Sequence, residues 1–246
     1  MVPRVAFSLA HDVHIGDYLV RIRCAGTGRP LLLLHDIGGC GASFAHLTSA
    51  IVAAGREAVA PDLPGFAQSD PIPGDIVDLI DYLQVLADQT IEGPIDVIGR
   101  GFGAFLALSL ASQQPERYQR LVLEDPMLPP SAGGRASSRM GAGRALNGAF
   151  TAVRRGRILQ NVGGFARAKS LLEALARPDQ AWWDGLAQIS ADCLLVDLGG
   201  GRPEDRARLS ALESAIKRLT VVDLSTGRNH QDAGSAAERA VLDFVG

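Results

Sequence analysis

Short apolar runs alternate with helix-like segments along most of this 246-residue chain. Eight runs that are rich in apolar or β-branched residues and bounded by turn residues are predicted strands: Val5–Leu9, Tyr18–Ala25, Leu31–His35, Glu57–Ala60, Ile95–Ile98, Leu121–Glu124, Leu194–Leu198 and Thr220–Asp223. From the third run onward they are separated by helix-like segments, roughly Ser43–Ala54, Asp75–Gln89, Ala104–Gln114, Asp205–Lys217 and Ala233–Val245. This order predicts an α/β fold, with one eight-stranded, mostly parallel sheet, helices on both of its faces, and a hairpin of the first two strands.

One long interval, residues 127–190, interrupts the alternation and predicts an inserted helical cap. We therefore expect a single domain whose core comprises residues 1–126 and 191–246. Counted from Pro126 to Ser190, the interval holds nine basic and three acidic residues, whereas the whole chain has a net charge of -3. The excess of arginine fits a solvated surface that pairs with an acidic body, and it also fits attraction of an anionic substrate.

Composition excludes several classes of partner. The net charge of -3 gives no reason to expect binding to nucleic acid or to an anionic membrane. The three cysteines have no CxxC spacing, so neither a disulfide framework nor a zinc site is expected. We find no signal-peptide h-region near the N-terminus and no apolar run long enough to span a membrane. These features favour a cytoplasmic protein that binds a small molecule, and they leave the oligomeric state open.

A tight turn is predicted at residues 99–103, whose sequence is GRGFG, between a strand run and a helix-like run. In this position the pattern resembles the turn GxSxG, which exposes a serine nucleophile beside backbone N–H groups that bind an oxyanion. Gly101 stands where the serine would be. Because glycine has no side chain, this chain lacks the nucleophile; an engineered replacement of serine is a further explanation of Gly101.

Three other segments extend the resemblance to the α/β-hydrolase superfamily over nearly the whole chain. Residues 31–39, LLLLHDIGG, resemble the strand and loop that carry the first oxyanion-hole residue, with Asp36 in place of the usual glycine. Residues 60–70, APDLPGFAQSD, resemble the D-x-P-G-x-G-x-S segment, with alanine at its later glycine. His230 follows the last strand run, where the family places its catalytic histidine.

The resemblance implies roles for particular residues. The backbone N–H groups of Ile37 and Phe102 are the expected oxyanion donors, His230 is the expected general base, and His35 is expected to be structural. Four residues are candidate substrate contacts: Asp36, Arg100, Trp182 and Trp183.

The acid of a catalytic triad is also missing from its usual place. The position expected after the seventh strand falls on Gly201 or Arg202, while Glu204 and Asp205 come slightly late and suit the first turn of a helix. Some family members, dehalogenases among them, place the acid after the sixth strand. Glu124 is the substitute candidate there.

The same glycines allow a rival interpretation. Residues 99–104, GRGFGA, satisfy the dinucleotide-binding pattern GxGxxG/A, and Glu124 or Asp125 ends the next strand as a ribose-binding carboxylate would. However, that turn usually follows the first strand of its unit, and here several strands precede it. We therefore expect neither a cofactor nor a metal.

The leading hypothesis is a hydrolase or lyase-type enzyme acting on a small apolar acyl or carboxylic compound. His230 would serve as general base, toward a substrate or toward one water in the space left by the serine, and backbone amides would stabilise the oxyanion. The alternative is a non-catalytic, ligand-binding protein that kept the fold after losing the triad.

Overall fold

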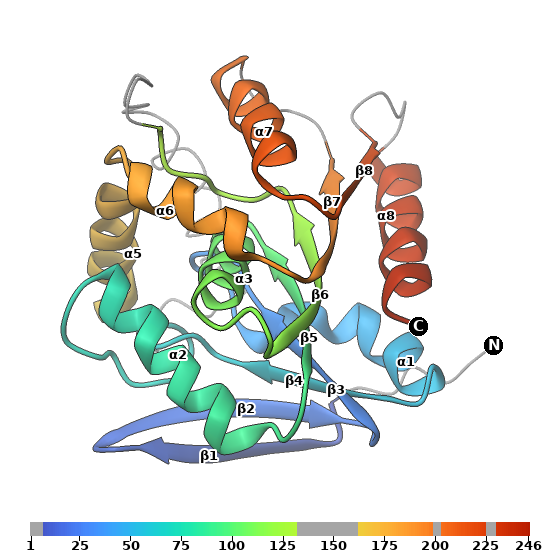
Figure 1. The fold of residues 1–246 in the computed structure, drawn as a ribbon. Coiled ribbons are helices and arrows are strands. Elements are labelled where there is room, and N and C mark those ends of the chain that lie inside the picture. The colour runs from blue at the N-terminus through green and yellow to red at the C-terminus, as the bar shows by residue number, and fades with distance from the viewer. Residues whose placement is uncertain (1–6, 132–161, 199–202, 225–229) are drawn as a thin grey trace.

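The computed structural model describes residues 7–131, 162–198, 203–224 and 230–246, with the side chains at 162–165, 203–204 and 230–234 outside that description. Its centre is an eight-stranded sheet in the order β1-β2-β4-β3-β5-β6-β7-β8 (Figure 1). The strands are β1 (Leu9–Ile15), β2 (Tyr18–Ala25), β3 (Arg29–Leu34), β4 (Arg56–Pro61), β5 (Ile95–Arg100), β6 (Tyr118–Glu124), β7 (Asp192–Asp197) and β8 (Leu219–Asp223). Strands β3 to β8 are parallel, whereas β2 is antiparallel to both β1 and β4. The predicted α/β-hydrolase fold is confirmed.

The first strand lies further along the chain than Val5–Leu9, which corrects the sequence prediction. Strand β1 begins at Leu9 and pairs with β2 across a two-residue turn, in which Gly16 has a φ of 58°. Such turns favour glycine, because L side chains rarely adopt positive φ. Six of the seven residues of β1 are exposed or half-buried, so a search for apolar runs does not detect this edge strand.

Helices cover both faces of the sheet (Figure 1). On one face, α1 (Ala45–Ala53) follows the short 3-10 helix η1 (Gly41–Phe44), and both lie on a core shared with α8 (His230–Val245). On the other face, α2 (Ile76–Thr90), α3 (Phe102–Gln113) and α7 (Pro203–Ala215) pack on a second core. Ten of the twelve residues of α3 are buried, so this helix is enclosed on every side.

The interval predicted as a cap contributes α5 (Val162–Leu175), α6 (Gln180–Gly185) and the 3-10 helix η3 (Leu186–Gln188) to the described residues. Arg167 of α5 donates from Nη1 to the Gly74 carbonyl (2.8 Å) and from Nη2 to the Asp75 carbonyl (3.4 Å). An arginine of the basic interval thus contacts the loop before α2, next to Asp75 at the helix N-cap and Asp78 in the first helical turn. Whether residues 127–190 form a separate cap remains a prediction, because 132–161 lie outside the described part.

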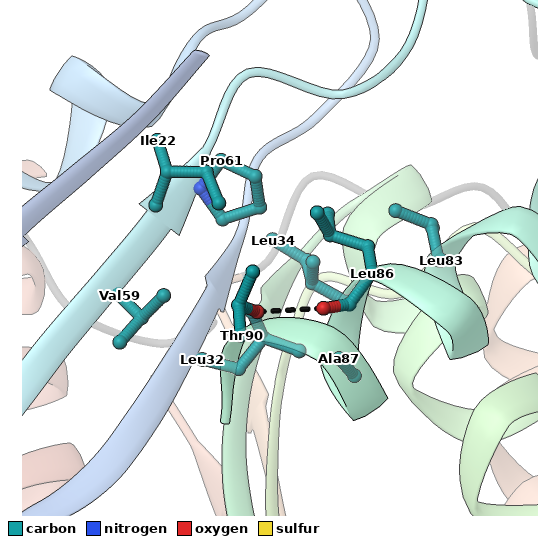
Figure 2. A pocket seen from close by; sticks show the side chains of 9 residues that line it. All are labelled: Ile22, Leu32, Leu34, Val59, Pro61, Leu83, Leu86, Ala87 and Thr90. Atoms are coloured by element: carbon teal, nitrogen blue, oxygen red, sulfur yellow. Dashed lines mark hydrogen bonds between the residues drawn. The ribbon is translucent and has the colours of Figure 1, made fainter. Parts of the chain in front are cut away.

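A small cavity of about 10 Å³ lies between α2 and strands β2, β3 and β4 (Figure 2). Its walls are apolar side chains, among them Ile22, Leu34, Val59 and Leu86. The one hydroxyl there, of Thr90, already donates to the Leu86 carbonyl at 2.6 Å. A volume at the lower limit for one water, in an apolar lining, is a packing gap rather than a ligand site. None of the predicted site residues lines it.

Candidate active site

The turn at residues 99–103 has the geometry that its sequence predicts. Gly101 stands between β5 and α3 with φ 54° and ψ -111°, a conformation that L side chains rarely adopt. Its N–H donates to the Glu124 carbonyl (2.9 Å), and its own carbonyl accepts from Met127 N–H (3.0 Å). The neighbouring glycines are required by crowding, because a Cβ at Gly99 or Gly103 would lie within 3.0 Å of backbone atoms. The turn therefore keeps the geometry predicted for it although position 101 has no side chain.

The place of the missing side chain is taken by Asp36, from the loop after β3. A Cβ built on Gly101 would lie within 3.0 Å of all three heavy atoms of the Asp36 carboxyl group. Real Cβ atoms essentially never approach other atoms that closely, so the two side chains cannot coexist without a shift. This corrects the expectation of a water in the space left by the serine, because the carboxylate fills that space.

The predicted oxyanion donors converge, but on an atom of the protein itself. Asp36 Oδ1 accepts from Ile37 N–H at 2.8 Å and from Phe102 N–H at 2.9 Å. Two backbone donors on one oxygen form the arrangement that stabilises an oxyanion. Here they hold a carboxylate that is already present, so a substrate oxygen could enter only if Asp36 moved away.

Sequence reasoning named Asp36 as a substrate contact and missed that its carboxylate accepts from both predicted oxyanion donors. Two departures from the family pattern could have indicated this position of the Asp36 side chain. Asp36 adds a side chain where glycine is usual, and Gly101 removes one where serine is usual. The two positions face each other, so the side chain that fills this space comes from position 36 and not from position 101.

His35 holds the loop that carries Asp36. Its side chain is 1% exposed, and Nε2 accepts from Leu63 N–H at 2.8 Å, so the ring is neutral and Nδ1 donates to the Asp36 carbonyl at 2.8 Å. Burial lowers the pKa of His35, since it removes the charged ring from water. His35 therefore has the structural role expected for it.

Arg100 and Glu124 form an ion pair beside the turn. Arg100 Nε donates to Glu124 Oε2, and Arg100 Nη2 lies 3.0 Å from His46 Nε2. The guanidinium also lies over the Phe44 ring, 4.8 Å from its centroid. Glu124 is 6% exposed, so Arg100 compensates a buried charge at the end of β6. This pairing gives both residues a structural function next to Gly101.

Asp125 is the second carboxylate that the dinucleotide-binding interpretation assigns to a ribose, and it too has a partner within the protein. Asp125 Oδ1 accepts from Leu198 N–H at 3.0 Å, which ties the end of β6 to the end of β7. With Glu124 paired to Arg100, both carboxylates proposed for a ribose have partners within the protein.

The two tryptophans pack against α3 and against each other. Trp183 is 7% exposed, and its Nε1 donates to the Pro129 carbonyl at 3.1 Å. Trp182 stacks on Phe105 with ring centroids 5.2 Å apart, and its Nε1 donates to Ser109 Oγ at 2.9 Å. Buried indole N–H groups need such acceptors. The structure thus uses Trp182 and Trp183 to anchor α6, and Trp183 offers no free surface to a substrate.

His230 begins α8, after the last strand as predicted, and its side chain lies outside the described residues. The positions expected for the triad acid, Gly201 and Arg202, lie outside them too, as does the side chain of Glu204. Asp205 pairs with Arg208 one turn further along α7, at 3.8 Å. The proximity of His230 to Asp36 or Glu124 therefore remains a prediction.

The described part of the chain presents neither a metal-binding cluster nor a membrane-spanning helix. There, no group of three or more His, Cys, Asp or Glu side chains is placed to hold a metal ion. In the same residues, no helix combines the length and the apolar character needed to cross a membrane. The three cysteines, all within the described residues, form no disulfide with one another.

Residues 29–149 of this chain match the model of a protein family that is described as "alpha/beta hydrolase fold". A haloalkane dehalogenase from Psychrobacter cryohalolentis is 30% identical over 105 residues, which are 41% of this chain and 34% of that protein. A 2-hydroxymuconate semialdehyde hydrolase from a Pseudomonas species is 29% identical over 127 residues, 49% of this chain and 44% of that protein. Each match therefore spans less than half of the relative's own length.

Solved structures match over a larger share of the chain. A haloalkane dehalogenase from Agrobacterium tumefaciens has a TM-score of 0.75 at 16% identity and covers 96% of both chains. A hydrolase from Pseudomonas aeruginosa has a TM-score of 0.74 at 20% identity, covering 97% of this chain and 99% of its own. At these identities the similarity establishes the fold.

Proposed function

We propose, because this chain belongs to the α/β-hydrolase superfamily, that it is a hydrolase or lyase-type enzyme that works without a serine nucleophile. Its substrate is a small apolar acyl or carboxylic compound, and His230 is the general base. The observation that carries the proposal is the tight turn at Gly101, with the Ile37 and Phe102 N–H groups converging on one oxygen.

The backbone geometry at Gly101 supports a catalytic role. Its φ and ψ are open to glycine and rarely adopted by residues with a side chain, and such positions cluster at functional sites. The surrounding hydrogen bonds maintain that conformation in a chain whose position 101 has no side chain to present. Acyl-enzyme chemistry is not expected, because loss of the serine nucleophile in a triad enzyme lowers kcat by about 10⁶-fold.

The identities of the relatives support a small organic substrate. They are a haloalkane dehalogenase and a 2-hydroxymuconate semialdehyde hydrolase, each similar over less than half of its length. The excess of arginine in residues 127–190 fits a substrate that carries a negative charge. We propose a cytoplasmic location, in keeping with the composition.

The test is turnover of a panel of small apolar esters, alkyl halides and vinylogous keto acids by the wild-type chain and by His230→Ala. We expect His230→Ala to lower kcat by about 10²-fold or more, because a positioned general base contributes about that factor. A matched control is His14→Ala, which alters an exposed histidine of the edge strand β1. Equal turnover in His230→Ala and wild type would contradict the role of His230.

A non-catalytic binding protein is the second candidate, and a specific observation favours it. Asp36 already satisfies both oxyanion donors, so the site as it stands does not offer them to a substrate. Saturable binding of a panel compound, without any turnover over days, would select this alternative.

A further inference from the structure

We propose that strand β8 is the interface of a homodimer, in which two copies of this chain pair antiparallel around a two-fold axis at Val221. Strands β6 and β7 lie between β8 and β5, the strand that leads into the Gly101 turn. The proposed contact is therefore separate from the candidate active site, and it does not depend on the proposed function.

Strand β8 (Leu219–Asp223) forms one edge of the sheet, and in the described part of the chain it pairs with β7 alone (Figure 1). At one end of this ladder, Cys193 N–H donates to the Arg218 carbonyl at 2.8 Å. At the other end, Leu224 N–H donates to the Asp197 carbonyl, also at 2.8 Å. These two bonds fix which backbone groups of β8 are used by β7.

The outer edge of β8 presents backbone groups that the sheet does not use. In a parallel ladder, alternate residues of a strand bond to the same neighbour, so the backbone groups of Thr220 and Val222 face β7. Those of Leu219 and Val221 face away from the sheet, and among the described residues they have no hydrogen-bond partner. Unpaired N–H and C=O groups on an edge strand are a template for a further strand.

The side chains of β8 also favour pairing. Its three central residues, Thr220, Val221 and Val222, are β-branched, and such residues suit a paired strand. Val221 is 39% exposed although its side chain is apolar. Antiparallel pairing about Val221 places this residue opposite its own copy, where the two exchange N–H···O=C bonds. The apolar contact and the backbone bonds therefore coincide at the axis.

The charges at the two ends of this edge have opposite signs. Lys217, which is exposed, comes just before β8, whereas Asp223 ends the strand beside Asp197 of β7. In the antiparallel pair, Asp223 stands opposite Leu219 of the other copy, and Lys217 of that copy is its diagonal neighbour. A parallel pair would instead bring like charges together. The charges thus fit a second copy of this chain in the antiparallel orientation.

The opposite edge of the sheet lacks these properties. Strand β1 carries His11, Asp12 and His14 in its middle, and Asp12 is paired with Arg21 of β2. Charged side chains on an edge strand oppose its pairing with another chain. Of the two edges, β8 is therefore the one that fits a second copy.

Sedimentation equilibrium of the full chain tests the interface. A five-residue strand is a small contact, so we expect a reversible dimer whose fraction rises with protein concentration. Val221→Lys should raise the dissociation constant by about 10²-fold or more, because two like charges then meet at the axis. The matched control, Leu9→Lys, alters an exposed leucine at the start of the opposite edge and should leave the dissociation constant unchanged.

Cross-linking tests the register. Residues that exchange hydrogen bonds across an antiparallel pair have Cα atoms about 5.5 Å apart, which a disulfide can span. Val221→Cys should therefore form an intermolecular disulfide under mild oxidation. Thr220→Cys should form far less, because Thr220 lies opposite Val222 of the other copy. The wild-type chain, with its three native cysteines, is the blank.

Exchange of charges tests the orientation. Lys217→Asp or Asp223→Lys alone should weaken the dimer a few-fold, because like charges then become diagonal neighbours. The double variant restores opposite charges and should regain the wild-type dissociation constant. Circular dichroism and urea unfolding verify that every variant is folded.

Other results overturn the inference. A monomer at every concentration up to about 1 mM would reject the interface. A dimer that Val221→Lys leaves intact, or that Leu9→Lys dissociates, would place the contact on another surface. Cross-linking through Thr220→Cys in preference to Val221→Cys would reject a two-fold axis at Val221.

Discussion

Two aspartates at opposite ends of the parallel strands are held in different ways. Asp96, near the start of β5, is 0% exposed and accepts from Arg29 Nη2 at 2.6 Å and from Arg56 Nη2 at 2.7 Å. Asp36, after the end of β3, accepts only from backbone N–H groups among the described residues, and it is half-buried. Two guanidinium groups neutralise the first carboxylate, whereas uncharged dipoles orient the second.

The difference shows two ways in which this fold holds a carboxylate. A buried carboxylate paired with arginine is stabilised as part of a salt bridge and has little left for chemistry. A carboxylate held by backbone dipoles keeps its charge, and its position is set without a counterion. The carboxyl ends of the strands are also where α/β folds bind their ligands.

The largest expected effect on stability is at Asp96. Asp96→Ala leaves the buried Arg56 without its carboxylate, and breaking a buried ion pair costs about 3–5 kcal/mol of unfolding free energy. Urea unfolding measures this loss. The control is Asp12→Ala, which breaks the more exposed pair with Arg21 and should cost about 1 kcal/mol or less. Equal losses in the two variants would contradict the structural role of Asp96.

Restoring serine tests the exchange between Asp36 and Gly101. Gly101→Ser alone places a side chain on the Asp36 carboxylate, so it should react poorly with a fluorophosphonate probe. Gly101→Ser combined with Asp36→Gly vacates that space and frees both N–H donors. We expect the double variant to be labelled about 10²-fold faster, the factor associated with one oxyanion-hole donor. Strong labelling of the single variant would show that Asp36 moves aside easily.

The loop that carries Asp36 should weaken at acid pH through His35. Burial lowers the pKa of His35 in the folded chain, so the unfolded chain binds a proton there first as pH falls below about 6.5. The stabilisation is therefore complete above that pH and is lost as pH falls, by up to about 1.4 kcal/mol per pH unit. Urea unfolding from pH 7.5 to 5.0 should show a smaller slope for His35→Gln, and an unchanged slope would exclude His35 as its source.

The smallest expected effect is the stability change in Asp36→Asn. Because no guanidinium depends on Asp36 among the described residues, and the amide oxygen can accept from the same donors, the change should be about 1 kcal/mol or less. The contrast with Asp96→Ala is measured in the same urea experiment. A loss of several kcal/mol would mean that Asp36 is held as a structural charge, which would remove the distinction between the two aspartates.

Much of the fold was predictable, because burial leaves a periodic pattern. Strands β3 to β8 appear as apolar runs, and the tight turn at Gly101 is indicated by its glycines and its place between a strand and a helix. The edge strand β1 was misplaced because its mostly exposed residues carry no apolar run. Trp182 and Trp183 were assigned to a substrate because sequence does not show that α6 lies on α3.

By itself the sequence determined the alternation of strands and helices, the tight turn and the absence of a nucleophile at position 101. Those properties depend on neighbours in the chain: periodic burial, glycine at positive φ and the chemistry of a single residue. Only the tertiary structure decided what fills the vacant place. Asp36 and Gly101 are 65 positions apart, and they meet because β3 and β5 are adjacent parallel strands that end at the same edge of the sheet.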